Sequence, residues 1–349
     1  ALMKKLLLLI LFLIVLFLGG CFGWTWYRDN RASNFGRTVE IYVRPEDSAS
    51  DVLEAVCSSA QVKDRKSLER SFRDKKVAEN LKPGHYTGSA ADASVYVARM
   101  LNNGWQTPVK LTLAGNLRIK QNIAAKISSQ MLADSASVYA ALCDDALLGE
   151  FGFCSRNAFS LLMPATYEMW WTATPEDILR RMKEAWDAFW TASNDGKAAR
   201  LGLSREQVSV LASLVKAESN YEPEMPLIAG VYLNRLAAGM PLQADPTVAF
   251  CFDYKPQRIL HKHLEVDSPY NTYRHPGLPP GPICVPSKAA LEAVLNPDYG
   301  GERGKGNFYF CANPDFSGRH IFARTLSEHN ANARAFQAEL TRRARAKRG

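Results

Sequence analysis

The chain carries, at positions 211–218, the stretch Leu-Ala-Ser-Leu-Val-Lys-Ala-Glu, which decides how its C-terminal part folds. Ser204 and Gln207 precede it at the spacing of a capping box, so the sequence predicts a helix that begins there. Apolar residues recur through the stretch at helical spacing, and Glu218 lies four residues after Leu214. This carboxylate is therefore expected on the apolar face of the helix.

The surroundings expected for Glu218 indicate acid–base chemistry. Burial on an apolar face disfavours the charged carboxylate and raises the pKa of a glutamate. Apolar sites can raise such a pKa to about 6, which suits donation of a proton to a leaving oxygen near neutral pH. The alternative is a glutamate at a helix end that pairs with Lys216 or Arg235 and has a structural role only.

The composition is that of an ordinary globular protein, with one exception at the N-terminus. Of the 349 residues, 47% are hydrophobic and 22% are charged, which excludes disorder, collagen and coiled coil. A chain of this length predicts two or three domains. Leu6 to Trp26 contains no charged residue, and its 21 positions are enough to cross a hydrocarbon core about 30 Å thick.

The flanks of this apolar segment predict its orientation. Lys4 and Lys5 precede it and aromatic residues close it, as in a single-pass anchor of the cytoplasmic (inner) membrane with the soluble domains outside the cytoplasm. The alternatives are a cleaved signal peptide and a lipoprotein anchored at Cys21, which follows Leu18-Gly19-Gly20. All three interpretations place the soluble part outside the cytoplasm.

Beyond the segment, the pattern of apolar residues predicts an α+β protein in several parts. Strands are expected at 38–43, 85–87 and 109–113, with helices starting near Ser48 and at 67–81 and 94–102. Residues 193–196 are typical of a linker. The expected parts are a membrane anchor at 1–27, a β-α-α-β subdomain at 37–114, a mainly helical middle region at 115–198, a third domain at 199–341 and a basic tail at 342–349.

The cysteines, histidines and charge carry less information about function. No CxxC motif is present and His261-x-His263 is interpreted as a surface loop, so no metal or cofactor is expected. Five positive charges of the net +8 lie in 342–348, and no basic stripe interleaves with aromatic residues, so nucleic acid is not an expected partner. The even number of cysteines after the apolar segment permits disulfides, with Cys143 and Cys154 as the best candidate pair: Cys57, Cys143, Cys154, Cys251, Cys284 and Cys311.

Several motifs stand in order along the chain, and together they are far more specific than any one of them. They are Leu211–Glu218 itself, Asn234-Arg235-Leu236-x-x-Gly239-Met240-x-Leu242-Gln243-x-Asp245-Pro246-Thr247, Tyr270-Asn271-Thr272-Tyr273, Gly277–Ile283, Phe308-Tyr309-Phe310, His320-x-Phe322 and His329-Asn330. In this set the chain resembles the MltG-type (YceG-like) endolytic murein transglycosylases over roughly residues 37–340. The β-α-α-β pattern at 37–114 is similar to a LysM-like module, a small fold that binds polymers containing N-acetylglucosamine.

The resemblance implies an architecture and a reaction. The architecture is α+β, with an N-terminal transmembrane helix, a LysM-like subdomain and a C-terminal mixed α/β lytic transglycosylase domain. The reaction is cleavage of the MurNAc–GlcNAc β-1,4 bond of peptidoglycan, with Glu218 first as acid and then as base while a 1,6-anhydro ring closes. Peptidoglycan synthases are implied as partners, and the activity would limit the length of nascent strands.

The motif residues also suggest where the sugars bind. Asn234 and Gln243 are expected to hydrogen-bond N-acetyl groups, with Asn234 exposed to solvent on its helix as the alternative. Asp245 is expected either to position substrate or Glu218, or to cap the turn at Asp245-Pro246-Thr247. The remaining candidates for the sugar cleft are Thr247, Tyr270, Asn271, Thr272 and Tyr273.

Two other functions stay open on the sequence. A muramidase-type hydrolase would use a second carboxylate, for which Asp245 is a candidate, at about 5–5.5 Å for retention or 6.5–9.5 Å for inversion. A scaffold that tethers the membrane to murein without cutting it would need no buried Glu218.

Overall fold

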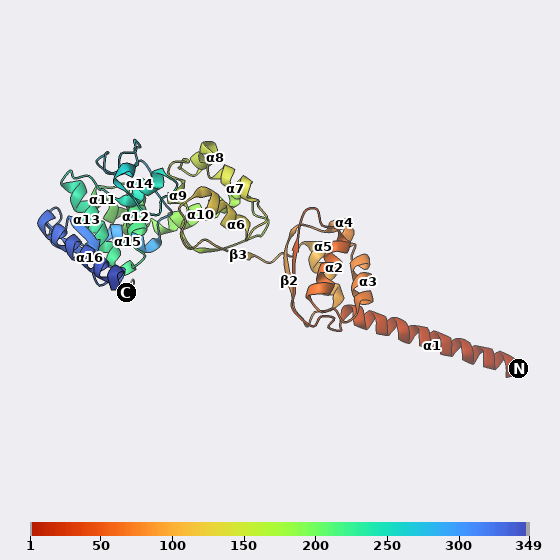
Figure 1. The fold of residues 1–349 in the computed structure, drawn as a ribbon. Coiled ribbons are helices and arrows are strands. Elements are labelled where there is room, and N and C mark those ends of the chain that lie inside the picture. The colour runs from red at the N-terminus through yellow and green to blue at the C-terminus, as the bar shows by residue number, and fades with distance from the viewer. Residues whose placement is uncertain (1, 347–349) are drawn as a thin grey trace. The chain divides into compact units, whose positions relative to one another are not determined.

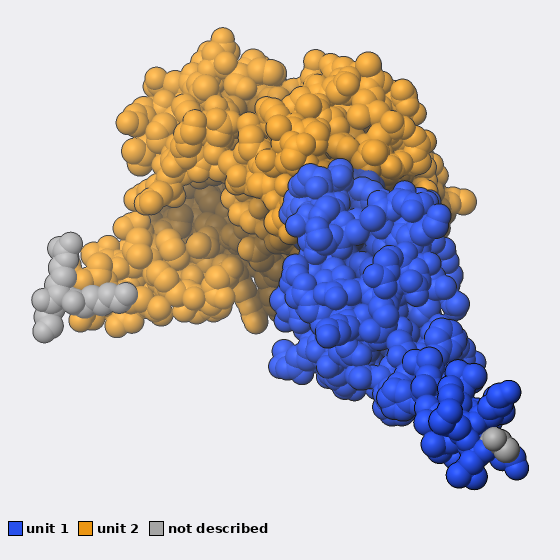
Figure 2. Space-filling view, turned by 90° about the vertical axis from the view of Figure 1, so that its right-hand side faces the viewer, with its two compact units in different colours: residues 1–111, 130–132, 168–173 blue, residues 112–129, 133–167, 174–349 orange. Residues whose placement is uncertain are grey.

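A computed structural model describes residues 2–346 (Figure 1), so Lys347 and Arg348 of the expected basic tail lie outside the described residues. Within residues 2–346 the fold is mostly helical, with three two-stranded sheets. The chain divides into two compact units, coloured separately in Figure 2. Unit 1 holds the residues up to Leu111 with 130–132 and 168–173, and unit 2 holds 112–129, 133–167 and the residues from Thr174 onward.

Helix α1 (Leu2–Asn30) contains the apolar segment and is long and apolar enough to cross a membrane, a property that a signal sequence shares. Its large apolar side chains are exposed. Its last turn joins unit 1 through two ion pairs, Arg28 with Asp64 at 3.0 Å and Asp29 with Arg70 at 2.7 Å. The helix therefore enters unit 1 without a break.

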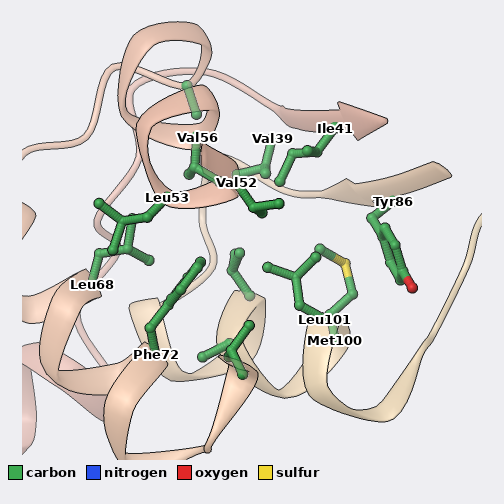
Figure 3. Packing of buried hydrophobic residues seen from close by; sticks show 14 of the residues in the cluster. Val39, Ile41, Val52, Leu53, Val56, Leu68, Phe72, Tyr86, Met100 and Leu101 are labelled. Atoms are coloured by element: carbon green, nitrogen blue, oxygen red, sulfur yellow. The ribbon is translucent and has the colours of Figure 1, made fainter. Parts of the chain in front are cut away.

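Unit 1 is built on an antiparallel pair of strands, β1 (Val39–Val43) and β2 (Gly84–Gly88), in which Ile41 lies opposite Tyr86. Alternate residues of β1 are buried, as the period of a strand requires. These side chains pack with those of the neighbouring helices in the core shown in Figure 3. The helices of unit 1 after α1 are α2 (Ala49–Ser59), α3 (Arg65–Asp74), α4 (Val77–Asn80) and α5 (Ser94–Asn103).

The expected strands at 38–43 and 85–87 and the helix at 94–102 are confirmed within one or two residues. The prediction of a single helix at 67–81 is wrong, because the helix is interrupted between α3 and α4. Lys76 there has a left-handed φ of 54°, a conformation that ends a helix. The break leaves Phe72 and Val77 both in the core.

The first part of unit 2 is a set of short helices. Strands β3 (Val109–Thr112) and β4 (Thr166–Met169) form a small sheet, and the division between the two units falls within both strands. The expected linker at 193–196 is wrong: Thr191 caps a helix there, and Asp195 in it pairs with Arg205 at 2.7 Å. The helices are α6 (Lys120–Ser128), α7 (Ser135–Ala141), α8 (Asp145–Glu150), α9 (Ala158–Leu161), α10 (Pro175–Phe189) and α11 (Ala192–Leu201).

The C-terminal part of unit 2 is centred on three helices that pack together, α12 (Arg205–Glu218), α13 (Met225–Ala237) and α15 (Lys288–Leu295). The capping box of Ser204 and Gln207 is confirmed. The mixed α/β character expected for this part is wrong, because its only sheet within residues 2–346 is an antiparallel pair, β5 (Tyr309–Ala312) and β6 (His320–Ala323). The remaining elements are α14 (Asp245–Cys251), α16 (Leu326–Ala346) and 3₁₀ turns at Glu222–Glu224 and His261–His263.

All seven cysteines are free thiols, so the expected disulfide between Cys143 and Cys154 is wrong. The two residues flank helix α8 in the chain; Cys143 is exposed and Cys154 is half-buried. A disulfide needs Cβ atoms within about 3.5–4.5 Å of each other, and closeness in sequence does not impose that geometry.

Candidate active site

The last turn of α12 places Glu218 at the wall of a cavity. Apolar residues earlier in the helix are fully buried, and Ser219 ends it in an extended conformation. The carboxyl group of Glu218 is half-buried and accepts a hydrogen bond from the hydroxyl of Tyr232 at 2.7 Å. Tyr232 comes from the middle of α13, so two packed helices fix the carboxyl group.

The cavity has a volume of about 320 Å³. Helices α12 and α13, the 242–245 segment, strand β5 and the start of α16 all contribute to its wall. The lining residues are Glu218, Tyr232, Arg235, Leu242, Gln243, Asp245, Tyr273, Tyr309, Phe310, Leu326 and His329. Polar and aromatic side chains thus surround one partly buried carboxyl group, a combination that suits a sugar with hydroxyl groups and apolar ring faces.

Burial raises the pKa of Glu218, because the charged carboxylate loses its hydration. The hydroxyl of Tyr232 and the charges of His320 and Arg235 act in the opposite direction, while Asp245 raises the pKa further. Burial is the largest of these effects, so Glu218 keeps its proton to a higher pH than an ordinary glutamate. This is the state that an acid catalyst needs.

Arg235 holds three walls of the cavity together. It is buried, with 8% of its surface exposed, and it donates from Nε to Phe308 O at 2.7 Å and from Nη1 to Leu242 O at 2.6 Å. Its guanidinium also lies 5.4 Å from the ring centroid of Tyr309. These contacts join α13 to β5 and to the 242–245 segment.

Asp245 and Tyr273 form a second polar pair at the cavity. The hydroxyl of Tyr273 donates to Oδ1 of the exposed Asp245 at 2.6 Å. Asp245 begins helix α14. Gln243 lies beside it with a left-handed φ of 49°, an uncommon conformation for a residue other than glycine.

Asn234, expected to contact N-acetyl groups, is fully buried and does not line the cavity. Its Nδ2 donates to Tyr299 O at 3.3 Å and to Asn307 O at 2.8 Å, and its Oδ1 accepts from Gly304 N at 2.7 Å. The amide is therefore occupied in holding the 299–307 loop.

Thr247, Asn271 and Thr272 are also buried behind the cavity. The hydroxyls of Thr247 and Thr272 lie 2.9 Å apart, and Thr272 Oγ1 accepts from Ala244 N at 3.0 Å. Asn271 donates to Leu264 O at 2.8 Å and to Val266 O at 2.9 Å. These side chains bind backbone groups of the 244–272 region, which positions the segment that carries Gln243 and Asp245.

The comparison with known proteins decides the family of the chain. Residues 41–335 match the YceG-like family. The chain belongs to this family. Its relatives include proteins named endolytic murein transglycosylase: one from Bacillus subtilis strain 168 is 28% identical over 84% of this chain and 83% of its own length. Another, from Streptococcus pneumoniae strain R6, is 31% identical over 49% of this chain and 31% of its own length.

A solved structure supports the same assignment. The crystal structure of a YceG-like protein from Listeria monocytogenes is 27% identical to the chain, with a TM-score of 0.53, over 84% of this chain and 98% of that one. The family resemblance drawn from the ordered motifs is confirmed.

In this YceG-like chain the cavity brings together Glu218, Gln243, Asp245 and Tyr273 from the expected residues. Tyr270 lines a different cavity, described below. Tyr232 was not expected, because its distance of 14 residues from Glu218 gives no periodic signal. His329 was noted only as part of a motif; its ring stacks on Tyr309 with centroids 5.4 Å apart, and its Nδ1 has no hydrogen-bond partner in the described structure.

Proposed function

We propose that the chain is an endolytic lytic transglycosylase of peptidoglycan. It cleaves the MurNAc–GlcNAc β-1,4 bond within glycan strands and leaves 1,6-anhydro-MurNAc ends. The observation that carries the proposal is the partly buried carboxyl group of Glu218, with its raised pKa, in a polar and aromatic cavity. Membership of the YceG-like family and the names of the relatives support it.

The proposed mechanism needs one carboxyl group. Protonated Glu218 donates its proton to the glycosidic oxygen as the bond from C1 of MurNAc to that oxygen breaks, and GlcNAc leaves with a free 4-hydroxyl. The C6 hydroxyl of the same MurNAc then attacks C1, and its proton returns to the Glu218 carboxylate. No water is consumed. An intramolecular nucleophile can have an effective molarity of about 10⁵ M or more, so the enzyme need supply no nucleophile.

The neighbours of Glu218 have supporting roles in this mechanism. Tyr232 holds the carboxyl group toward the cavity and stabilises the carboxylate that forms after the first proton transfer. Gln243, Asp245 and Tyr273 are proposed to bind the sugars, since they line the cavity. Asn234, Thr247, Asn271 and Thr272 are proposed to act through the segments that they hold.

We expect the Tyr232→Phe variant to move the alkaline limb of the pH–rate profile to higher pH, by up to about one unit. The hydroxyl of Tyr232 favours the charged form of Glu218, so its loss raises the pKa of Glu218. Because activity falls as Glu218 loses its proton, the fall then begins at higher pH. The rate at the optimum should drop several-fold as the carboxyl group loses its orientation. The measurement is cleavage rate against pH.

Tyr86→Phe is the matched control for this variant. Tyr86 is fully buried in unit 1, and its hydroxyl donates to Lys82 O at 2.8 Å. Its removal should leave the pH profile unchanged. An unshifted profile in the Tyr232→Phe protein would contradict the role given to Tyr232.

A muramidase-type hydrolase is the second candidate, because Asp245 lines the same cavity as Glu218. Mass spectrometry of muropeptides separates the two reactions. Products ending in 1,6-anhydro-MurNAc, lighter by one water than hydrolysis products, are expected. Reducing MurNAc ends would replace the proposal by the two-carboxylate hydrolase. The non-cutting scaffold would release neither product, and the burial of Glu218 argues against it.

Two features of unit 1 support a proposal for the place where this activity occurs. We propose that α1 is a single-pass anchor of the cytoplasmic membrane, with the soluble domains outside the cytoplasm, and that the 37–114 region is a LysM-like subdomain that binds the glycan. The lipoprotein alternative at Cys21 needs cleavage within α1. Termination of nascent strands beside peptidoglycan synthases is proposed as the biological role. Radiolabelled palmitate retained by the purified chain would favour the lipoprotein.

A further inference from the structure

Two further cavities of unit 2, of about 370 and 230 Å³, share Arg118 in their linings. We call them the basic cavities. Neither has a lining residue in common with the cavity at Glu218. The larger one includes Lys216 and Asn220, from the end of α12 and the residues just after it. It therefore begins beside the turn of the helix that carries the catalytic carboxyl group.

Four cations line the basic cavities, Arg118, Lys120, Arg156 and Lys216, against one carboxylate, Asp253. Within residues 2–346, no ion pair joins any of the four to a carboxylate. Lys120 donates to the carbonyls of Leu142 at 2.9 Å and Ser155 at 2.7 Å, and Lys216 donates to Asn220 Oδ1 at 2.7 Å. These partners are neutral, so they do not compensate the two positive charges.

The acidic residues nearby do not cancel this charge. Asp253 is exposed and pairs with Lys255 at 3.2 Å. Asp145 lies outside the linings and accepts from Ser155 N at 2.6 Å. That hydrogen bond, with smaller effects of Lys120 and Arg156, lowers the pKa of Asp145. The Nε of Arg118 is buried without a hydrogen-bond partner in the described structure.

The smaller basic cavity has a rigid aromatic wall. The hydroxyl of Tyr254 donates to Ile283 O at 2.6 Å, and the Arg118 guanidinium lies 4.9 Å from the centroid of the Tyr254 ring. The Tyr270 ring lies 4.6 Å from that of Phe250. A Cβ added to Gly281 would lie 2.4 Å from the carbonyl oxygen of Arg156, so this glycine allows the backbone to pack directly against Arg156.

We propose that the basic cavities bind the carboxylates of the peptide stems that branch from the glycan strand, an inference that rests on the proposed function. Guanidinium groups pair with carboxylates through two parallel hydrogen bonds, and the aromatic wall accommodates the apolar parts of a stem. In this proposal one strand places a sugar at Glu218 and a stem in the basic cavities, whose linings include Lys216 and Asn220 on either side of Glu218 in the chain. Stem binding selects strands that carry peptides.

The test compares three glycan preparations of equal strand length. One has intact stems, one has stems whose carboxylates are converted to amides, and one has its stems removed by an amidase. Dissociation constants are measured for the full-length Glu218→Gln chain in detergent micelles, so that no strand is cut. Amidation and stem removal are each expected to weaken binding about tenfold, a change of about 1.4 kcal/mol.

Two further variants on the same background locate the effect. Arg156 is exposed, so Arg156→Gln should fold normally, and it is expected to remove most of the tenfold difference. Arg200→Gln makes the same change of charge on the exposed part of α11, outside both linings, and should preserve the difference. Equal affinity for the three preparations, or the same ratio in both variants, overturns the inference.

Cleavage by the wild-type chain separates this inference from the proposed function. If the chain cuts stripped strands and binds all three preparations with equal affinity, the transglycosylase proposal stands and the stem-binding proposal is wrong. If the chain binds strands with intact stems tenfold more tightly but cuts none of them, the stem-binding proposal stands and the transglycosylase proposal is wrong.

Discussion

The Glu218→Gln variant is expected to cut glycan strands about 10³-fold more slowly than the wild-type chain while keeping its fold. Glutamine has the shape of glutamate and can still accept the hydrogen bond from Tyr232, but its amide is too weak an acid to transfer a proton to the glycosidic oxygen. The measurement is the initial rate of release of 1,6-anhydro-muropeptides.

Glu222→Gln is the matched control. Glu222 lies four residues further on, is exposed at the start of a 3₁₀ turn and does not line the cavity, so this variant should keep the wild-type rate. A folded Glu218→Gln protein with normal activity would remove Glu218 from the mechanism.

The stability of the Glu218→Gln variant also has a definite pH dependence. The pKa of Glu218 is higher in the folded chain than in the unfolded chain, so the wild-type protein loses stability as pH rises through the folded-state pKa. Glutamine does not titrate. The Tm of the variant relative to that of the wild type should therefore rise as pH increases from the unfolded-state pKa to the folded-state pKa and stay constant above it, as thermal unfolding in a pH series would show.

Gly230→Ala is expected to lower the free energy of unfolding by about 3 kcal/mol, with loss of activity. A Cβ at this position of α13 would lie 1.9 Å from Asp298 O and 2.6 Å from Asp298 C. Backbone cannot yield as a flexible side chain can, so α13 and the 298–299 segment must separate. That segment leads into the loop held by Asn234, one turn later on the same helix.

The control for this substitution is Gly196→Ala, also in the interior of a helix. The only neighbour of a Cβ there is the Arg200 side chain at 3.8 Å, an ordinary contact. Alanine should stabilise α11 by up to about 1 kcal/mol. Chemical denaturation measures both changes, and a Gly230→Ala chain as stable as the wild type would refute the close packing of α13.

The sequence predicts α12 and Glu218 well because their signals are local. A capping box and helical periodicity lie within 15 residues, from Ser204 to Glu218. The opposite wall of the cavity depends on contacts between residues far apart in the chain, such as Arg235 with Phe308. Periodicity contains no information about such contacts.

The residues expected to bind sugars show a second limit of prediction from a single sequence. Asn234 and Thr272 have the side chains that sugar sites use, and they stand in motifs beside Gln243 and Asp245. A single sequence does not distinguish an amide that faces a ligand from one that holds a backbone loop. In the folded chain both are fully or almost fully buried and bonded to the protein. Polar residues of a motif can thus build the segment that presents the site.

The junction between α1 and the rest of unit 1 determines the distance of this unit from a bilayer that α1 would span. Trp26, at the end of the apolar segment, is two residues from Arg28, which already pairs with Asp64. At 1.5 Å per residue, a helix rises only about 3 Å over that interval. If α1 spans a membrane, the rest of unit 1 therefore lies directly at the lipid surface. On the proposed function, we expect unit 1 to contact the layer of peptidoglycan next to the membrane.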